Sequence, residues 1–113
     1  MHIFYLNARY PPEGIAGPSN STRFLAEQMV RMGHRATVFC RTESAGLVRE
    51  QAAGVDIVRV GLEHSLAHAA GLFAQTLDSE RPDVIHALFP REFPVGMLAQ
   101  AASRIGLHCH IYA

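Results

Sequence analysis

The residue types best suited to ligand chemistry lie in one loop near the start of the chain. An apolar run at residues 2–6 leads into a loop at 7–19 that carries Gly14 and Gly17, and a helical pattern follows. Where a strand, a glycine-bearing loop and a helix start meet, backbone N–H groups and the positive end of the helix can approach a phosphate. The sequence therefore predicts binding of a phosphorylated ligand at Gly14 and Gly17.

The spacing of these glycines excludes the two commonest nucleotide-binding loops. A dinucleotide fingerprint needs two glycines one residue apart and a third beyond them, and a Walker A loop ends in Gly-Lys-Ser/Thr. The alternative role of Gly14 and Gly17 is to relieve strain in a tight strand-to-helix turn. Arg9 and Glu13, on the same loop, are candidates for binding ligand hydroxyl or phosphate groups, and the alternative for these charges is simple solvation.

The elements that must position this loop follow from an alternation of short apolar runs with helical patterns. Strands are predicted at residues 3–6, 36–40, 55–60, 83–87 and 107–112, and helices at 20–32, 66–77 and 94–105, with a short helix at 47–51. Phe24, Met29, Met32 and Phe73 are expected in the core. Alternating strands and helices predict an α/β fold, a Rossmann-like doubly wound parallel sheet of about five strands in the order 3-2-1-4-5.

This strand order places a second candidate region beside the glycine loop. The order reverses between the first and fourth strands, so a ligand is expected over loops 7–17 and 88–94. His86 lies at the carboxyl end of the fourth strand, and Arg91 and Glu92 follow on the loop. These three side chains are candidates for ligand contact. The alternative for His86 is a buried strand histidine that is hydrogen-bonded to the backbone.

Composition limits the partners and the compartment. A chain of 113 residues with 10 basic and 10 acidic residues has room for one domain and no charge excess that would attract nucleic acid or an anionic membrane. Cys40 and Cys109 each lie in an apolar run, which suits reduced, buried thiols. The first apolar run is too short for a signal peptide or a membrane span. We expect a cytoplasmic protein without a transmembrane segment.

Histidine pairs raise the question of a metal. His64 and His68 share a helix face, and His108 and His110 share a strand face. Neither pair has the carboxylate or thiolate ligands that complete a zinc site, so no metal and no cofactor are expected. A covalent nucleophile is not predicted either, because the chain has no Gly-x-Ser-x-Gly elbow.

Four segments in order carry a resemblance to a known family. They are the loop at 9–17, the passage at 23–38 with Leu25-Ala26, Gly33-His34 and Val38, the strand at 81–87 and the helix start at 94–99. Together they resemble the N-terminal domain of retaining glycosyltransferases with the GT-B fold, the family 4-like, group 1 enzymes. Many relatives carry a His-x-His pair after the fourth strand, where this chain has His86 and Leu88.

The resemblance implies a function and separate roles for two domains. In such enzymes two Rossmann-like domains face a cleft, the N-terminal one receives the acceptor, and the C-terminal one binds the nucleotide-sugar donor. Residues 1–113 would then be a partial N-terminal domain without the donor-binding domain, and inactive alone. The parent enzyme would transfer a hexose from a nucleoside-diphosphate sugar to a glycan, lipid or small-molecule acceptor, in the cytoplasm or at the inner face of the membrane, without a metal.

A rival interpretation belongs to another class. A stand-alone flavodoxin-like or Rossmann-like module would use the same reversal of strand order to bind a small ligand or a signalling partner without catalysis. A receiver-like version needs an aspartate at the end of the third strand, where this chain offers only Glu63 beyond the strand.

Overall fold

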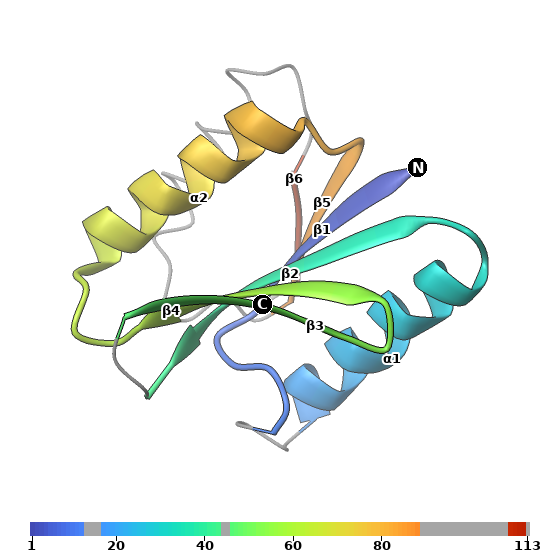
Figure 1. Cartoon of the computed structure of the whole chain (residues 1–113), viewed down its shortest axis with the longest axis horizontal. Coiled ribbons are helices and arrows are strands. Elements are labelled where there is room, and N and C mark those ends of the chain that lie inside the picture. Colours follow the sequence, from blue (N-terminus) through green and yellow to red (C-terminus); the bar gives the residue numbers. More distant parts are fainter. Residues whose placement is uncertain (13–16, 44–45, 89–108, 113) are drawn as a thin grey trace.

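The computed structural model describes residues 1–12, 17–43, 46–88 and 109–112. The elements are β1 (His2–Leu6), α1 (Gly17–Arg31), β2 (Arg35–Thr42), β3 (Leu47–Ala52), β4 (Val55–Gly61), α2 (Leu66–Glu80), β5 (Val84–Leu88) and β6 (Cys109–Tyr112). The strands form one sheet in the order β3-β4-β2-β1-β5-β6, with α1 and α2 on opposite faces (Figure 1). The predicted α/β class is confirmed.

The five predicted strands are present, mutually parallel and in the predicted order. The sixth strand, β3, corrects the sequence analysis, because the predicted short helix at 47–51 is wrong. Residues 47–52 pair antiparallel with β4 through a two-residue turn, in which Ala53 and Gly54 have φ of 51° and 80°. Two consecutive positive φ values match the twist of a tight hairpin, so this turn favours a strand.

The sequence explains where the two described helices begin and end. α1 starts at Gly17, three residues before the predicted start, with Pro18 in its first turn, and Gly33 follows its end with φ of 89°. Ser65 caps α2, because its side-chain oxygen accepts a hydrogen bond from the His68 N–H at 3.0 Å. The predicted helix at 94–105 lies outside the described residues.

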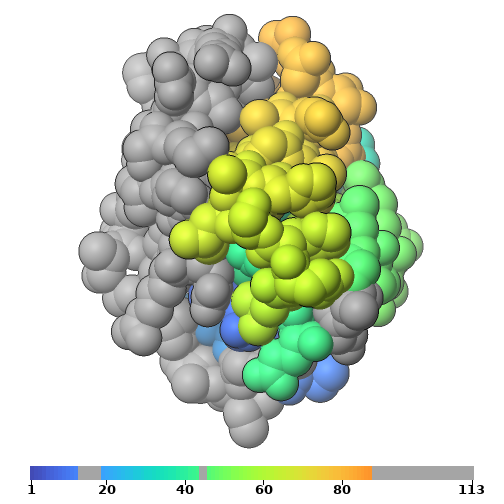
Figure 2. All heavy atoms as spheres, turned by 90° about the vertical axis from the view of Figure 1, so that its left-hand side faces the viewer, coloured from blue at the N-terminus to red at the C-terminus, as the bar shows by residue number. Residues whose placement is uncertain are grey.

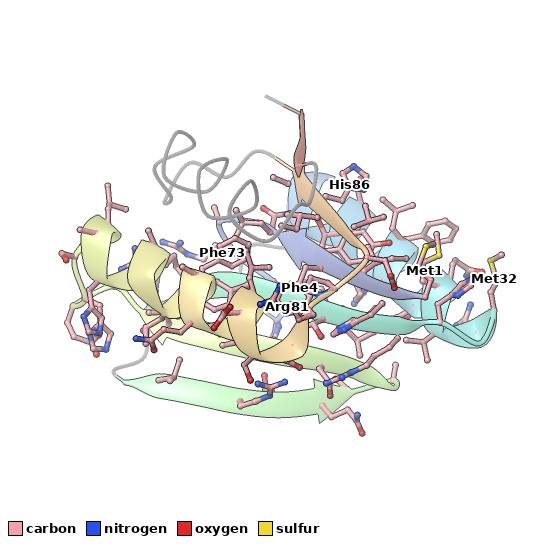
Figure 3. All side chains as sticks on the ribbon, turned by 90° about the horizontal axis from the view of Figure 1, so that it is seen from above. Met1, Phe4, Met32, Phe73, Arg81 and His86 are labelled. Carbon is pink, nitrogen blue, oxygen red and sulfur yellow. The ribbon has the colours of Figure 1, made fainter. Side chains whose placement is uncertain are left out.

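The sheet separates two apolar layers. Phe73 and Leu77 of α2 pack on one face against Phe4, Phe39 and strand neighbours, with 6.3 Å between the ring centroids of Phe4 and Phe73 (Figure 3). Figure 2 looks onto this face, with α2 across its middle and β3 in green at the right-hand edge. The other layer lies under α1 and includes Tyr5, Tyr10, Val38 and Ile57.

The prediction of core residues on α1 is partly wrong. Phe24 and Met32 are 64% and 68% exposed, whereas Met29 packs against the core and Phe73 of α2 is fully buried. Thr22 and Ala26 are the fully buried residues of α1. Phe24 is two residues from each of them, so the helical period places it on the opposite, exposed face.

Candidate functional site

Strands β1, β2, β4 and β5 end at one edge of the sheet. They are parallel, so their last residues Leu6, Thr42, Gly61 and Leu88 all lie toward this carboxyl edge. β1 has β2 on one side and β5 on the other, so the strand order reverses between β1 and β5 as predicted. Ligands of open α/β sheets bind outside the carboxyl ends of the strands at such a reversal.

The loop that leaves β1 is tied down from its first residue. Asn7 is buried, its Nδ2 donates to Thr22 Oγ1 of α1 at 2.6 Å, and its Oδ1 accepts from the Ala8 N–H at 2.7 Å. The Arg41 N–H of β2 donates to the Ala8 carbonyl at 3.0 Å. The first turn of the loop is therefore fixed to both the sheet and α1.

The structure describes two of the predicted ligand residues on this loop. Arg9 is partly buried, and its Nη1 donates to the carbonyl of Ala8 at 2.9 Å, so its guanidinium folds back on the loop. Gly17 is the first residue of α1. The candidates Glu13 and Gly14, like Arg91 and Glu92 on the loop after β5, lie outside the described residues.

His86 lies in the middle of β5 and not at its carboxyl end, where it was predicted. In the sheet register it lies beside Tyr5 of β1 and His110 of β6. The Tyr5 and His86 rings are 5.7 Å apart at 39°, and Tyr5 belongs to the α1-side layer. His86 is therefore partly buried on the face of the sheet opposite α2 (Figure 3), two residues before the strand ends.

Two buried arginines at this edge were missed by the sequence analysis. Arg41 of β2 is 1% exposed and donates to three carbonyls, those of Val60 at 3.3 Å, Gly61 at 3.1 Å and His64 at 2.6 Å. It thereby holds the loop between β4 and α2. The missed signal was an arginine inside an apolar run, because arginine is rarely buried unless its donors are paired.

Arg59 of β4 is the second buried arginine, 7% exposed on the α1 side of the sheet. Its Nη1 donates to the Tyr10 carbonyl at 2.9 Å and its Nη2 to the Pro11 carbonyl at 2.6 Å. Its Nε donates to Glu50 Oε1 of β3 at 2.6 Å. Burial raises the pKa of Tyr10 to about 12, with the guanidinium carbon of Arg59 5.8 Å from its ring centroid.

The histidine pair at the start of α2 stacks without completing a metal site. The rings of His64 and His68 are 4.7 Å apart at 16°. Glu63 Oε1 lies 3.5 Å from His64 Nε2 and accepts the Gly46 N–H, and this backbone hydrogen bond lowers the pKa of Glu63. Within the described part of the chain, no group of three or more His, Cys, Asp or Glu side chains is arranged to hold a metal ion.

Two further features bear on partners and redox chemistry. Cys40 is buried and does not form a disulfide, as expected from its apolar run. Neither α1 nor α2, the helices of the described residues, is long and apolar enough to cross a membrane.

Comparison with known proteins supplies the family. The model of one protein family, the glycosyl transferase 4-like domain, matches residues 16–113. No curated protein matches the chain. The family match covers α1 and every later element, and it leaves out β1 and the first residues of the loop after it. This chain therefore belongs to the glycosyl transferase 4-like domain family.

Proposed function

We propose that this domain forms the acceptor-side wall of a retaining glycosyltransferase with the GT-B fold. The enzyme transfers a hexose from a nucleoside-diphosphate sugar to a glycan, lipid or small-molecule acceptor. Membership of the glycosyl transferase 4-like family is the observation that carries the proposal. The parallel sheet, with an anchored loop at its strand-order reversal, supports it.

The proposal assigns roles to the residues around the reversal. Gly14 and Gly17 allow the loop after β1 to approach a phosphate, and the positive end of α1 stabilises its charge. Arg9 and Glu13 bind acceptor groups from the same loop. His86 is the candidate catalytic residue and contacts the substrate from β5, where it lies beside Tyr5 in the sheet.

Arg91 and Glu92 bind acceptor groups from the loop after β5. Catalysis of this kind relies on positioning and on stabilising the charges of an oxocarbenium-like transition state and a departing diphosphate. Both walls of the cleft are needed for it. The second, donor-binding wall is a separate domain in this proposal, and no metal takes part.

Two glycine variants test the loop in an enzyme that carries both walls. Gly17 is the first residue of α1, where valine costs little helix stability, but its side chain would block a phosphate. Gly33 has φ of 89° with no atom within 4 Å of an added Cβ, so Gly33→Ala adds backbone strain of about 1 kcal/mol and nothing else.

We expect Gly17→Val to lower kcat/KM for nucleoside-diphosphate hexoses far more than it lowers Tm, and Gly33→Ala to do the reverse. Equal loss of activity and stability in Gly17→Val would show that the loop has only a structural role.

The assignment of the acceptor and donor sites to two different domains can be tested separately. Purified residues 1–113 should transfer no radiolabelled hexose from any nucleoside-diphosphate sugar, because the donor site is assigned to the other domain. Transfer above background by this chain alone would overturn that assignment.

A further inference from the structure

Arg59 connects two parts of the chain that are far apart in sequence. It lies on β4 and donates to the carbonyls of Tyr10 and Pro11, two consecutive residues of the loop after β1. The guanidinium carbon of Arg59 also lies 5.8 Å from the centroid of the Tyr10 ring. Arg59 therefore holds the part of the loop that follows Asn7 and Ala8, which are bound separately by Thr22 and β2.

The chemistry of the guanidinium suits this task. Its planar fork presents several N–H donors in fixed directions, so one group can bind two neighbouring carbonyls and a carboxylate at once. Lysine would bring only a point charge to the same place. The two bonds to Tyr10 and Pro11 thus set both the position and the direction of the loop backbone.

The buried charge is compensated from the edge of the sheet. Glu50, on the edge strand β3, accepts from Arg59 Nε at 2.6 Å, and its side chain is 46% exposed. Glu50 lies beside Arg59 because β3 pairs with β4 through the Ala53–Gly54 turn. The sequence analysis did not predict this hairpin. A chain of contacts thus runs from β3 through Arg59 to the loop.

We infer that Arg59 is a positioning residue for the ligand site: it holds Tyr10 and Pro11 against the sheet so that the segment leading to Gly17 starts from a fixed point. That segment carries the ligand candidates Glu13 and Gly14 in sequence, and α1 fixes its other end. The assignment of a ligand to the loop rests on the proposed function, whereas the anchoring by Arg59 does not.

Trypsin provides a test of the anchor that needs no substrate. The Arg9–Tyr10 peptide bond is a trypsin site directly before the anchored carbonyls, and Tyr10 is buried. Arg59→Met removes all the donors and keeps a long apolar stem, so native-state cleavage after Arg9 should accelerate at least about tenfold. Arg59→Lys should fall between the wild type and Arg59→Met, and it keeps a charge at the site if Arg59→Met folds poorly.

Arg41→Met is the matched control. Arg41 is also buried, and its side chain binds the carbonyls of Gly61, at the end of β4, and of His64, in the loop that follows. With each variant held the same interval below its own Tm, Arg41→Met should leave cleavage after Arg9 within about twofold of the wild type. Equal acceleration in both arginine variants would overturn the proposal, because it would report a general loss of stability.

Kinetics of the two-domain enzyme separate this inference from the proposed function. If the loop binds substrate, Arg59→Lys should raise the KM of one substrate about tenfold, that is, by about 1.4 kcal/mol of binding, with a smaller change in kcat. Faster cleavage after Arg9 with unchanged KM and kcat would overturn the positioning role in the ligand site. An enzyme that transfers no hexose but shows the cleavage pattern would contradict the proposed function and confirm the anchor.

Discussion

The two edges of the sheet both carry arginines, and the protein uses them in opposite ways. At the carboxyl edge, Arg41 and Arg59 are buried and donate to loop carbonyls. Toward the amino edge, the side chains of Arg35, at the start of β2, and of Arg49, which reaches there from the middle of β3, are 53% and 50% exposed and pair with carboxylates. The carboxyl-edge arginines fix backbone positions, whereas the amino-edge arginines balance surface charge.

The amino-edge cluster centres on Glu80 at the end of α2. Its Oε1 accepts from Arg35 at 2.7 Å and from Arg49 at 2.9 Å, and Arg35 also lies 3.3 Å from Asp56. The Glu80 side chain is only 12% exposed, but both guanidiniums are half-exposed, so water and salt screen these pairs and each contributes little. Water cannot take over the hydrogen bonds that the buried guanidiniums donate. Mutations at the two edges should therefore change the free energy of unfolding by very different amounts.

Arg41→Met should have the largest effect. It leaves the carbonyls of Val60, Gly61 and His64 without their donor, so the free energy of unfolding should fall by about 3 kcal/mol or more. Urea unfolding measures this change directly. Arg35→Met at the amino edge is the control, and a similar loss in both variants would remove the contrast between the edges.

The second-largest effect is expected at high pH, which should lower the stability of the carboxyl edge. Burial raises the pKa of Tyr10 to about 12, whereas an unfolded tyrosine ionises near about 10. Between these values the unfolded state binds fewer protons, so stability falls as the pH rises, by about 2 kcal/mol at about pH 11.5. The chain has no lysine to titrate in this range, since all 10 basic residues are arginine.

Tyr10→Phe should remove most of that alkaline loss. Burial also raises the pKa of Tyr5, so a part of the loss should remain in this variant. Thermal unfolding at a series of pH values compares the two proteins. An unchanged alkaline loss in Tyr10→Phe would mean that Tyr10 is not held in the apolar layer.

The buried parallel strands could be located from sequence because they are continuous apolar runs. Their alternation with helices then predicted the strand order. β3 could not be located in this way, because residues 47–52 are all exposed and follow neither a strand nor a helix pattern. Its formation depends on the turn at Ala53 and Gly54 and on pairing with β4. An edge strand of this kind is specified by its neighbour more than by its own residues.

The anchors of the candidate site were hidden for a different reason. The balanced charge of the chain gives no indication that Arg41 and Arg59 are buried, since composition treats every arginine as solvated. Their partners are backbone carbonyls, which leave no trace in the sequence. The strand order was sufficient to predict where a site is expected, whereas the groups that hold the loop there emerged only from the three-dimensional contacts.

Glu80→Gln should have a smaller effect, confined to the amino edge. The amide oxygen can still accept hydrogen bonds, but the attraction to Arg35 and Arg49 is lost, so stability should fall by about 0.5 to 1 kcal/mol. About 0.5 M NaCl should reduce this difference, because exposed ion pairs are screened. A loss that salt leaves unchanged would show that Glu80 acts as a buried group like Arg41.

The smallest expected effect is a loss of stability at low pH that is caused by His2, at the start of β1. Burial, and then the charge of Arg35, lower the pKa of His2, whose Nε2 lies 2.8 Å from Thr37 Oγ1. Below the ordinary histidine pKa of about 6.5, the unfolded state therefore binds more protons than the folded state, and stability falls as the pH falls. His2→Gln should flatten the decline in Tm between about pH 7.5 and pH 5.5.

Arg35→Gln separates the two causes of that acid sensitivity. Its removal takes away a positive charge that opposes protonation of His2 but leaves the burial of the ring, so the decline in Tm should become shallower without disappearing. Arg49→Gln removes another charge of the same cluster, one that does not lower the pKa of His2, so it should leave the slope unchanged. A steeper decline in Arg35→Gln would mean that this arginine stabilises the amino edge mainly through Asp56 and Glu80, and that these carboxylates, rather than His2, control its response to acid.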